Sequence, residues 1–449
     1  MNHIPPIKNP AHRWFSEARY GLFIHWTPSS AVGRCEQVLM REWLDQKAYA
    51  ENCRQWNPRS FDARKWADMA VASGMRYSIL VTRHHSGYCL WDSKLSDYNS
   101  MRQAPMRDFV GEYVEAFRAR RLRVGLYYSL GDFRIPAYFE GPRHNPEGWR
   151  RYVDFVHGQV GELLSNYGKI DIIWFDGAWP RSAEQWRSEE LIQKIRALQP
   201  DIMINNRLDA QDPDSAANDQ LEMPGESAVL GDFGTPEQRV AADPHRPWES
   251  CQVTNHRLWG YARGEHVKTA EMLLDSLCDC ASKGGNLLLN VGPDPDGVVD
   301  PRVEENLRRI GKWLQVHGEA VYGTDRDGQV SDPITYGYQS RKGNILYLIF
   351  RFWPHTESMP IFGLQNTVRK ATLLCDGSAV QVDTYEHGLL LKGLPVDKPC
   401  DLYPVIRLEC GPGPLPLPCA HEALWQGDPL RFVPWARARG EGPNLDGSW

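Results

Sequence analysis

The chain lacks long apolar runs and any strong imbalance of charge. No stretch approaches the about eighteen consecutive apolar residues that mark a membrane-spanning helix. Lys and Arg number 51 and Asp and Glu 57, a formal net charge of −6 over 449 residues. No block of basic residues forms the stripe that binds a phosphate backbone. Residues 1–6 have neither the basic nor the apolar segment of a secretory signal. We therefore expect no nucleic-acid or membrane partner and a cytoplasmic location.

Paired cysteines and several common motifs are also missing. The ten cysteines are scattered without a Cys-x-x-Cys pair. Cys278 and Cys280 lie too close along a helical pattern to form a disulfide without distortion. We interpret the cysteines as mostly reduced thiols. No Walker loop, Rossmann glycine fingerprint or nucleophile-elbow Ser occurs between a strand and a helix.

What the sequence has in excess is tryptophan, with seventeen residues. Many occupy loops and the ends of strand-like runs. An indole packs well in a core, and it also stacks on the apolar face of a sugar ring. The composition is otherwise that of an ordinary globular protein, with 42% hydrophobic residues.

Short apolar runs alternate with helical patterns from residue 19 to about residue 323. This succession is typical of a parallel sheet with outer helices, and it predicts a (β/α)8-like TIM barrel over residues 1–325. Short alternating runs follow and predict a small β-sandwich over residues 326–412. A Pro-rich tail covers 413–449. The aperiodic stretch 208–247 is too long for a simple connection, so we expect it to be functional.

Polar side chains follow several of the strand-like runs. The run 169–177 ends on Asp176, and Arg207 ends the next run. The ends of parallel barrel strands converge, so these groups are expected to meet at one site. The same reasoning brings in His25, His84, His85 and either Tyr127 or Tyr128, with Trp174 nearby. Adjacent residues of a strand point to opposite sides, so at most one of the two neighbouring histidines is expected to face the barrel axis directly, and the other is expected to reach in from the rim.

Together these segments closely resemble the family 29 glycoside hydrolases, the retaining α-L-fucosidases. The resemblance covers the barrel and continues into the predicted sandwich. Its carriers, in chain order, are Phe23-Ile24-His25-Trp26, Arg41-Glu42-Trp43, Arg83-His84-His85-Ser86-Gly87-Tyr88, Tyr127-Tyr128-Ser129, Trp174-Phe175-Asp176-Gly177, Asn206-Arg207, Asp232-Phe233-Gly234-Thr235-Pro236-Glu237, Trp248-Glu249-Ser250-Cys251, Trp259-Gly260-Tyr261 and Asn286-Leu287-Leu288-Leu289-Asn290-Val291-Gly292-Pro293.

The resemblance implies a role for each matching residue. Asp176 matches the nucleophile of the family. The positions that match the fucose pocket are His25, Glu42, Trp43, His84, His85, Tyr128, Trp174 and Arg207. The implied reaction releases terminal α-L-fucose by double displacement and needs no cofactor and no metal. The implied partner is a fucosylated oligosaccharide or glycoconjugate. Fucose lacks a 6-hydroxyl, so an apolar wall formed by Trp26, Trp174 or Phe175 is expected at its methyl group.

The acid/base is assigned to Glu237, which matches a pattern of many bacterial members and lies in the aperiodic stretch. Glu249 is the runner-up, because it begins the next strand, and Glu222 and Glu226 follow. Two other functions compete with the fucosidase prediction. One is a catalytically silent fucose-binding protein that keeps the pocket, and the weaker one is a metal-dependent barrel hydrolase. No pattern in the sequence predicts an oligomeric state.

Overall fold

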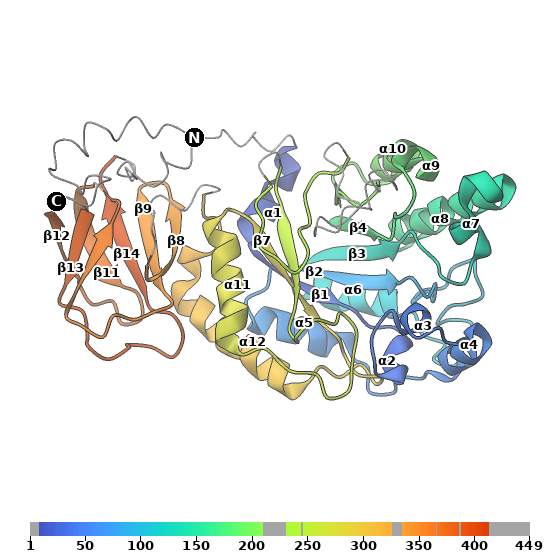
Figure 1. Ribbon diagram of the computed structural model, residues 1–449, viewed down its shortest axis with the longest axis horizontal. Coiled ribbons are helices and arrows are strands. Elements are labelled where there is room, and N and C mark those ends of the chain that lie inside the picture. Colours follow the sequence, from blue (N-terminus) through green and yellow to red (C-terminus); the bar gives the residue numbers. More distant parts are fainter. Residues whose placement is uncertain are drawn as a thin grey trace, which may run out of the picture. The chain divides into compact units, whose positions relative to one another are not determined.

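The structure is a computed structural model that describes residues 9–209, 230–243, 246–325, 335–364, 366–385 and 388–412 (Figure 1). The chain divides into two units, Met1–Gly328 and Gln329–Trp449. The predicted tail at 413–449 lies outside the described residues. So do Glu222 and Glu226, the two remaining acid/base candidates.

A parallel sheet of seven strands forms the centre of the first unit. Its strand order is β5-β4-β3-β2-β1-β7-β6, and every pairing is parallel. The strands are buried almost throughout, as expected for a sheet with both faces covered. Their bounds are β1 Tyr20–Ile24, β2 Tyr77–Arg83, β3 Arg123–Ser129, β4 Ile172–Asp176, β5 Met203–Ile204, β6 Glu249–Val253 and β7 Asn286–Val291.

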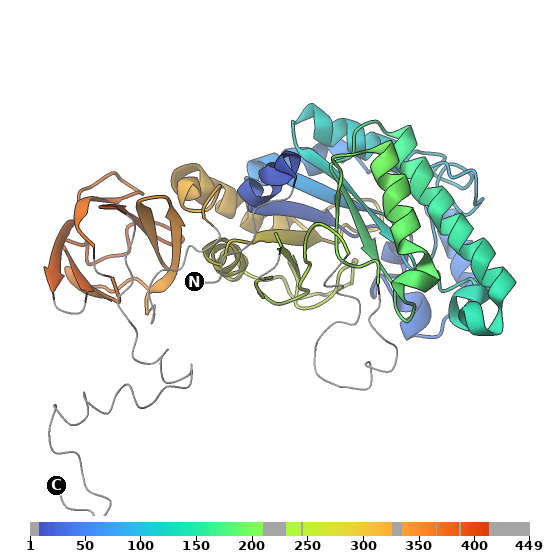
Figure 2. The same ribbon diagram turned by 90° about the horizontal axis from the view of Figure 1, so that it is seen from above.

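Amphipathic helices connect the strands and lie outside the sheet (Figures 1 and 2). Several begin at a side-chain cap: the Asp108 carboxylate accepts from Gly111 N at 2.9 Å, and the Asn145 carbonyl oxygen accepts from Gly148 N at 2.8 Å. The long helices are α4 Gln46–Gln55, α5 Ala63–Ala72, α6 Phe109–Ala119, α8 Pro146–Asn166, α10 Ser188–Leu198, α11 Ala270–Ser282 and α12 Pro301–His317. The shorter ones are η1 Pro10–His12, α1 Arg13–Ala18, α2 Ser29–Val32, α3 Val38–Arg41, α7 Pro136–His144, α9 Ala183–Trp186 and η3 Gly318–Ala320.

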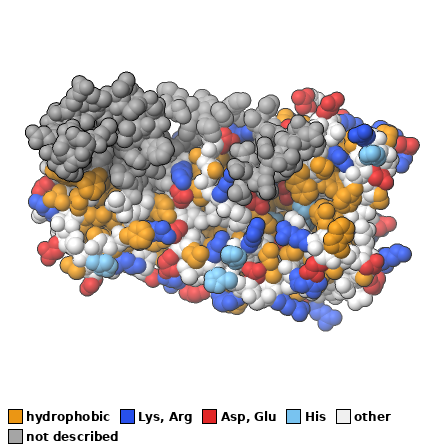
Figure 3. Space-filling view, in the orientation of Figure 1, with side chains coloured by type: hydrophobic (Ala, Val, Ile, Leu, Met, Phe, Trp, Pro, Cys, Tyr) orange, Lys and Arg blue, Asp and Glu red, His pale blue; other side chains and the backbone are white. Residues whose placement is uncertain are grey.

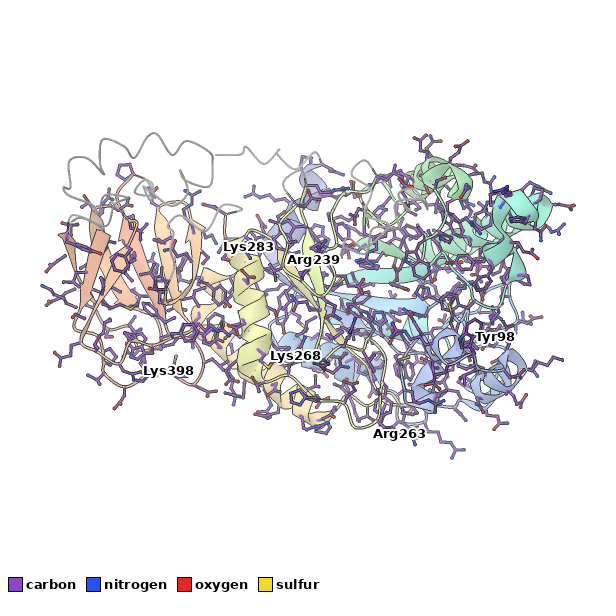
Figure 4. The ribbon with its side chains drawn as sticks, in the orientation of Figure 1. Tyr98, Arg239, Arg263, Lys268, Lys283 and Lys398 are labelled. Atoms are coloured by element: carbon purple, nitrogen blue, oxygen red, sulfur yellow. The ribbon has the colours of Figure 1, made fainter. Side chains whose placement is uncertain are left out.

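The gap between the edge strands β5 and β6 is bridged by an irregular segment, 232–238. Phe233 pairs in parallel with Asn205, just after β5, and Glu237 pairs in parallel with Cys251 in β6. Its main chain also bonds to β6, because Cys251 N donates to Pro236 O at 3.1 Å and Gln238 N donates to Cys251 O at 2.9 Å. The next residue, Arg239, labelled in Figure 4, accepts a hydrogen bond from Ser250 Oγ through its carbonyl. The segment therefore takes the place of the eighth strand.

The second unit consists of two antiparallel sheets. Their strand orders are β11-β14-β9-β8 and β10-β13-β12. Alternate residues of both sheets, such as Leu346, Leu348, Leu389 and Leu391, meet in one apolar core, as in a β-sandwich. The strands are β8 Gly337–Lys342, β9 Ile345–Phe350, β10 Ser358–Phe362, β11 Val368–Leu373, β12 Gln381–Tyr385, β13 Gly388–Lys392 and β14 Val405–Cys410. The predicted fold class, a (β/α)8-like barrel followed by a β-sandwich, is confirmed.

On the face drawn in Figure 3, acidic and basic side chains are interspersed among hydrophobic ones. Within the described ranges, no helix combines the length and the apolar character that a membrane crossing requires.

Candidate active site

A pocket lies at the carboxyl ends of the parallel strands. Side chains from different strands converge at this end of a barrel. The lining residues are Phe23, His25, Gln37, His84, His85, Tyr127, Trp174, Asp176, Trp179, Arg207, Glu237, Cys251 and Trp259.

Asp176 is the last residue of β4, and its side chain lines the pocket. Its carbonyl oxygen accepts a hydrogen bond from Leu130 N at 2.7 Å, which fixes the end of the strand. Tyr127 Oη donates to Asp176 Oδ2 at 3.0 Å, and Arg207 Nη1 donates to Oδ1 at 3.2 Å. Burial raises the pKa of the carboxyl, but Arg207 and the Tyr127 hydrogen bond help to bring it below the ordinary value. Asp176 is therefore ionised at neutral pH.

Arg207 follows β5 and binds two carboxylates with a single nitrogen. Its Nη1 lies 3.2 Å from Asp176 Oδ1 and 3.0 Å from Glu237 Oε2. Thr235 holds the rest of the guanidinium: its hydroxyl accepts from Nε at 2.9 Å and its carbonyl from Nη2 at 3.0 Å. Burial lowers the pKa of the guanidinium, but the two carboxylates raise it by a larger amount, so the pKa lies above its usual range. Arg207 is a fixed cation between two acids.

The shared nitrogen limits the separation of the two carboxyl groups. Asp176 Oδ1 and Glu237 Oε2 cannot lie farther apart than the sum of their 3.2 Å and 3.0 Å contacts with Arg207. Retaining glycosidases hold their two carboxyl groups ~5–5.5 Å apart, and inverting enzymes ~6.5–9.5 Å. For this pair of oxygens the upper bound lies below the separation of inverting enzymes.

Glu237 reaches the pocket from the segment that bridges β5 and β6. Its backbone pairs with Cys251, which fixes where the side chain leaves the barrel wall. Oε1 accepts a hydrogen bond from Trp259 Nε1 at 3.2 Å. The side chain is 19% exposed, so the carboxylate is shielded but still accessible from the pocket.

His25 is a neutral imidazole, and one of its two ring nitrogens forms a hydrogen bond within the protein. Its Nδ1 lies 2.6 Å from Asn290 Oδ1, and Asn290 Nδ2 donates to Trp259 O at 2.7 Å. This second bond identifies the amide oxygen as the atom that faces His25, so Nδ1 is the donor. Burial lowers the pKa of His25 to about 3, against the effect of the Asn290 hydrogen bond. Nε2 is then an acceptor for a hydroxyl group.

His85 has the same tautomer for a similar reason. Its Nδ1 lies 2.6 Å from Ser129 Oγ, and the hydroxyl proton of Ser129 is donated to Gly131 O at 2.7 Å. Nδ1 must therefore donate to Ser129. Burial lowers the pKa of His85 to about 4, although the negative Asp176 opposes this. Its unprotonated Nε2 lies 3.6 Å from Asp176 Oδ2.

Both neighbouring histidines line the pocket, contrary to strict alternation. The pairing of β2 with β3 shifts register between Val81 and Arg83, and β2 ends at Arg83. Beyond that point strand alternation no longer applies, so His84 and His85 both turn inward. Burial lowers the pKa of His84 well below its usual value, and its ring stacks on Tyr127 at 5.8 Å. Among the described residues, His84 Nδ1 and His85 Nε2 are buried without a hydrogen-bond partner.

Aromatic rings supply the apolar side of the pocket. Trp174 lines it as predicted, whereas the other two wall candidates do not. Trp26 is 1% exposed and stacks on Phe61 at 4.8 Å, and Phe175 is fully buried. Both point away because they lie out of phase with the inward residues of their strands. Trp259 tilts against His25 at 5.1 Å and adds a second indole.

Tyr128, predicted to bind substrate, does not line the pocket, and Tyr127 lines it instead. The two side chains leave β3 on opposite sides. Tyr128 is completely buried, and its hydroxyl donates to Gln159 Oε1 on helix α8 at 2.8 Å. Tyr127 faces the barrel axis and reaches Asp176.

The prediction that Glu42 and Trp43 line the pocket is also wrong. They follow the short helix α3, at the end opposite to Gln37, and Gln37 is the residue that reaches the pocket. Glu42 instead pairs with Arg34 at 2.8 Å. Trp43 has a left-handed backbone with φ of 50° and is 91% exposed. One helical turn thus carries both side chains away from the strand ends.

Glu249 does not reach the pocket either. It is fully buried, and both of its carboxylate oxygens accept hydrogen bonds from core side chains. An acid/base needs an oxygen that can contact the glycosidic oxygen, so the runner-up assignment is excluded by this packing.

Several pocket residues were missed in the sequence. Phe23 lies two residues before His25 on the same strand face, so strand alternation would have found it. Cys251 and Trp259 lie inside motifs already recognised, but their orientation depends on the fold. Gln37 and Trp179 lie in connecting segments and carry no local signal.

The described part of the chain holds no cluster of metal-ligating side chains around the pocket histidines. Within the part of the chain that the structure describes, no group of three or more His, Cys, Asp or Glu side chains is placed to hold a metal ion. The nitrogens of His25 and His85 are instead paired singly with Asn290 and Ser129.

Two close carboxyl groups on a barrel rim, with neutral imidazoles and indoles around them, define a glycoside hydrolase. Among such enzymes, this chain belongs to the alpha-L-fucosidase family, whose sequence model matches residues 5–319. The human plasma alpha-L-fucosidase is 31% identical over 415 residues, which cover 85% of each chain.

Solved structures agree with this assignment. The alpha-L-fucosidase isoenzyme 1 from Paenibacillus thiaminolyticus is 34% identical with a TM-score of 0.80, covering 90% of this chain and 99% of that one. A family 29 alpha-L-fucosidase from Bacteroides thetaiotaomicron, solved as a trapped covalent intermediate with 2-fluoro-fucosyl fluoride, is 29% identical with a TM-score of 0.81. It covers 90% of this chain and 97% of that one.

Proposed function

We propose that this enzyme removes terminal α-L-fucose from fucosylated glycans or fucosides with retention of configuration, using Asp176 as nucleophile and Glu237 as acid/base. The observation that carries the proposal is the contact of both carboxylates with one nitrogen of Arg207. That contact supports the short carboxyl separation of a double displacement. The trapped intermediate of the Bacteroides relative is consistent with the same chemistry.

In the first step an oxygen of Asp176 attacks the anomeric carbon. The bond from this carbon to the glycosidic oxygen breaks, and Glu237 gives its proton to that departing oxygen. Asp176 begins ionised, because Arg207 and Tyr127 hold its pKa low. Glu237 must begin protonated. The product is a fucosyl ester of Asp176.

In the second step a water molecule attacks the same carbon from the side that the aglycone has left. Glu237, now a carboxylate, takes a proton from the water, and the ester bond to Asp176 breaks. Two inversions restore the configuration of fucose. Tyr127 and Arg207 stabilise the negative charge that returns to the Asp176 carboxylate, because both donate hydrogen bonds to it.

The neutral histidines suit a sugar better than an ionic ligand. Nε2 of His25 and Nε2 of His85 are acceptors for hydroxyl protons, and His84 has a buried nitrogen without a partner among the described residues. Trp174 covers the C–H face and provides an apolar surface for the methyl group. Arg207 completes the binding set that we assign to fucose.

The test is turnover of 4-nitrophenyl α-L-fucoside by the wild type and by Asp176→Ala and Glu237→Ala, each with and without azide. We expect kcat to fall ~10⁴-fold or more for Asp176→Ala and ~10²–10⁴-fold for Glu237→Ala. Azide should rescue Glu237→Ala and give fucosyl azide of retained configuration. Asp154→Ala, which removes an exposed carboxylate paired with Arg187, is the matched control and should leave kcat unchanged.

An azide product of inverted configuration from Glu237→Ala would contradict the assigned roles. Fucose binding by calorimetry without turnover of aryl or natural fucosides by the wild type would instead identify a silent fucose-binding protein.

A further inference from the structure

Glu249 is an acidic residue in the interior of the barrel. It begins β6 and is 0% exposed. Tyr77 Oη of β2 donates to its Oε2 at 2.6 Å, and Trp174 Nε1 of β4 donates to its Oε1 at 2.9 Å. The carboxylate therefore joins β2, β4 and β6 across the barrel axis. Alternate strands supply such interior layers, which are usually filled by Val, Ile and Leu. Burying a carboxyl group there in place of an apolar side chain destabilises the fold unless the carboxyl forms hydrogen bonds with specific partners.

One of the two partners carries the effect of Glu249 to the reacting groups. The Trp174 ring stacks on Tyr127, with ring centroids 5.5 Å apart and an angle of 20°. The indole also contacts Arg207, whose Cζ lies 4.7 Å from the ring centroid. Tyr127 and Arg207 are the two groups that donate hydrogen bonds to Asp176. The orientation of one indole is thus coupled to both.

The indole is tied down at one atom. Trp174 has a single polar group, Nε1–H, which can only donate. The acceptor Glu249 comes from another strand, so the bond fixes the ring about the axis that stacking leaves free. Stacking alone has a broad optimum and resists sliding only weakly.

We infer that Glu249 is a positioning residue of the proposed reaction: it holds the Trp174 indole, and through it Tyr127 and Arg207, in register with Asp176. This rests on the function proposed above. Glu249 never contacts the substrate, because its oxygens are used by Tyr77 and Trp174 and it does not line the pocket.

Two substitutions separate positioning from other roles. Glu249→Gln keeps an oxygen for Trp174 Nε1 and places an amide N–H toward Tyr77 Oη, which can accept it. Glu249→Leu keeps most of the volume and removes the acceptor. We expect Glu249→Gln to retain kcat within ~3-fold, and Glu249→Leu to lose ~100-fold, as for a small misplacement of reacting groups. KM should change far less than kcat, because the histidines that bind the hydroxyls are untouched.

Glu162→Gln is the matched control. Glu162, on helix α8, also accepts from an indole, Trp91 Nε1 at 3.1 Å, and from the backbone of Lys94 at 2.8 Å, but lies outside the pocket lining. It should leave kcat and KM unchanged. All variants are compared in the full chain, with near-UV circular dichroism to verify the fold.

A second measurement uses Trp174→Phe, which keeps the buried carboxyl and most of the ring but removes Nε1–H. If Glu249 acts through this bond, Trp174→Phe alone lowers kcat by ~100-fold, and Glu249→Leu in the Trp174→Phe background causes no further loss. The single Trp174→Phe variant tests the inference even if Glu249→Leu fails to fold, because wild-type kcat in Trp174→Phe would overturn it. The inference is overturned if folded Glu249→Leu has wild-type kcat, or if Glu249→Gln is inactive and rescued by azide, which would make Glu249 an acid/base. Absence of turnover in the wild type would overturn the proposed function instead.

Discussion

Replacing Glu249 with Gln should change how the stability of the barrel depends on pH. The substitution removes a buried ionisable group and leaves an acceptor for Trp174 in place. Burial raises the pKa of Glu249 from 4.5 to about 7, and the hydrogen bonds from Tyr77 and Trp174 oppose only part of this effect. In the unfolded chain the same carboxyl is in water and titrates near its ordinary pKa.

The sign follows from where the proton binds more tightly. A carboxyl with a raised folded pKa holds its proton more strongly in the folded protein. The stability that Glu249 contributes is therefore present below the unfolded pKa and is lost as pH rises through the folded value. One pKa unit corresponds to about 1.4 kcal/mol, so the shift from 4.5 to about 7 amounts to ~3 kcal/mol of unfolding free energy.

The measurement is urea unfolding of the wild type and Glu249→Gln, followed by tryptophan fluorescence between about pH 4.5 and about pH 7.5. Every other titrating group is common to both proteins, so the difference between their unfolding free energies isolates residue 249. Over this range the wild type should lose ~3 kcal/mol relative to Glu249→Gln. A difference that stays constant within ~0.5 kcal/mol would refute the view that burial controls this carboxyl.

Three further outcomes concern the pocket. Tyr127→Phe, which loses the hydrogen bond to Asp176, should reduce kcat/KM ~10-fold, whereas Tyr128→Phe should leave it unchanged because that hydroxyl points away from the pocket; equal losses would contradict the orientation of β3. Arg207→Met should lower kcat and move the acidic limb of the pH profile of kcat/KM to higher pH, since the positive charge that lowers the pKa of Asp176 is gone; an unmoved limb would show that Arg207 does not control the pKa of Asp176. Trp43→Ala should change KM for the aryl fucoside by less than ~2-fold, as expected for a side chain 91% exposed and outside the pocket lining, and a large rise in KM would restore it to the site.

The sequence alone was sufficient for those residues whose position depends on a strand end. Asp176, His25 and Arg207 follow apolar runs, and the carboxyl ends of parallel strands meet in one place whatever the details of packing. The barrel, the sandwich and the family followed from periodicity and from the order of the motifs. Most of the residues predicted for the site line the pocket for the same reason.

Which side chains of each strand face the barrel axis could be decided only from the tertiary structure. Period-two alternation shows that Tyr127 and Tyr128 face opposite sides, but which side is the barrel axis depends on the register with the neighbouring strands. The same ambiguity made Glu249 a candidate acid/base, when its phase in β6 places it in the interior layer. A register shift near the end of β2 allows both His84 and His85 to line the pocket.

Irregular segments were the other part that only tertiary structure decided. The segment that carries Glu237 has no strand period, yet it closes the barrel, because the unpaired edges of β5 and β6 bind its backbone. Gln37 reaches the pocket, whereas Glu42 and Trp43 do not, because they lie at opposite ends of the single helical turn α3. Local sequence determines which side chains end a strand. The long-range hydrogen bonds of the closed barrel determine where a segment without its own periodicity is held.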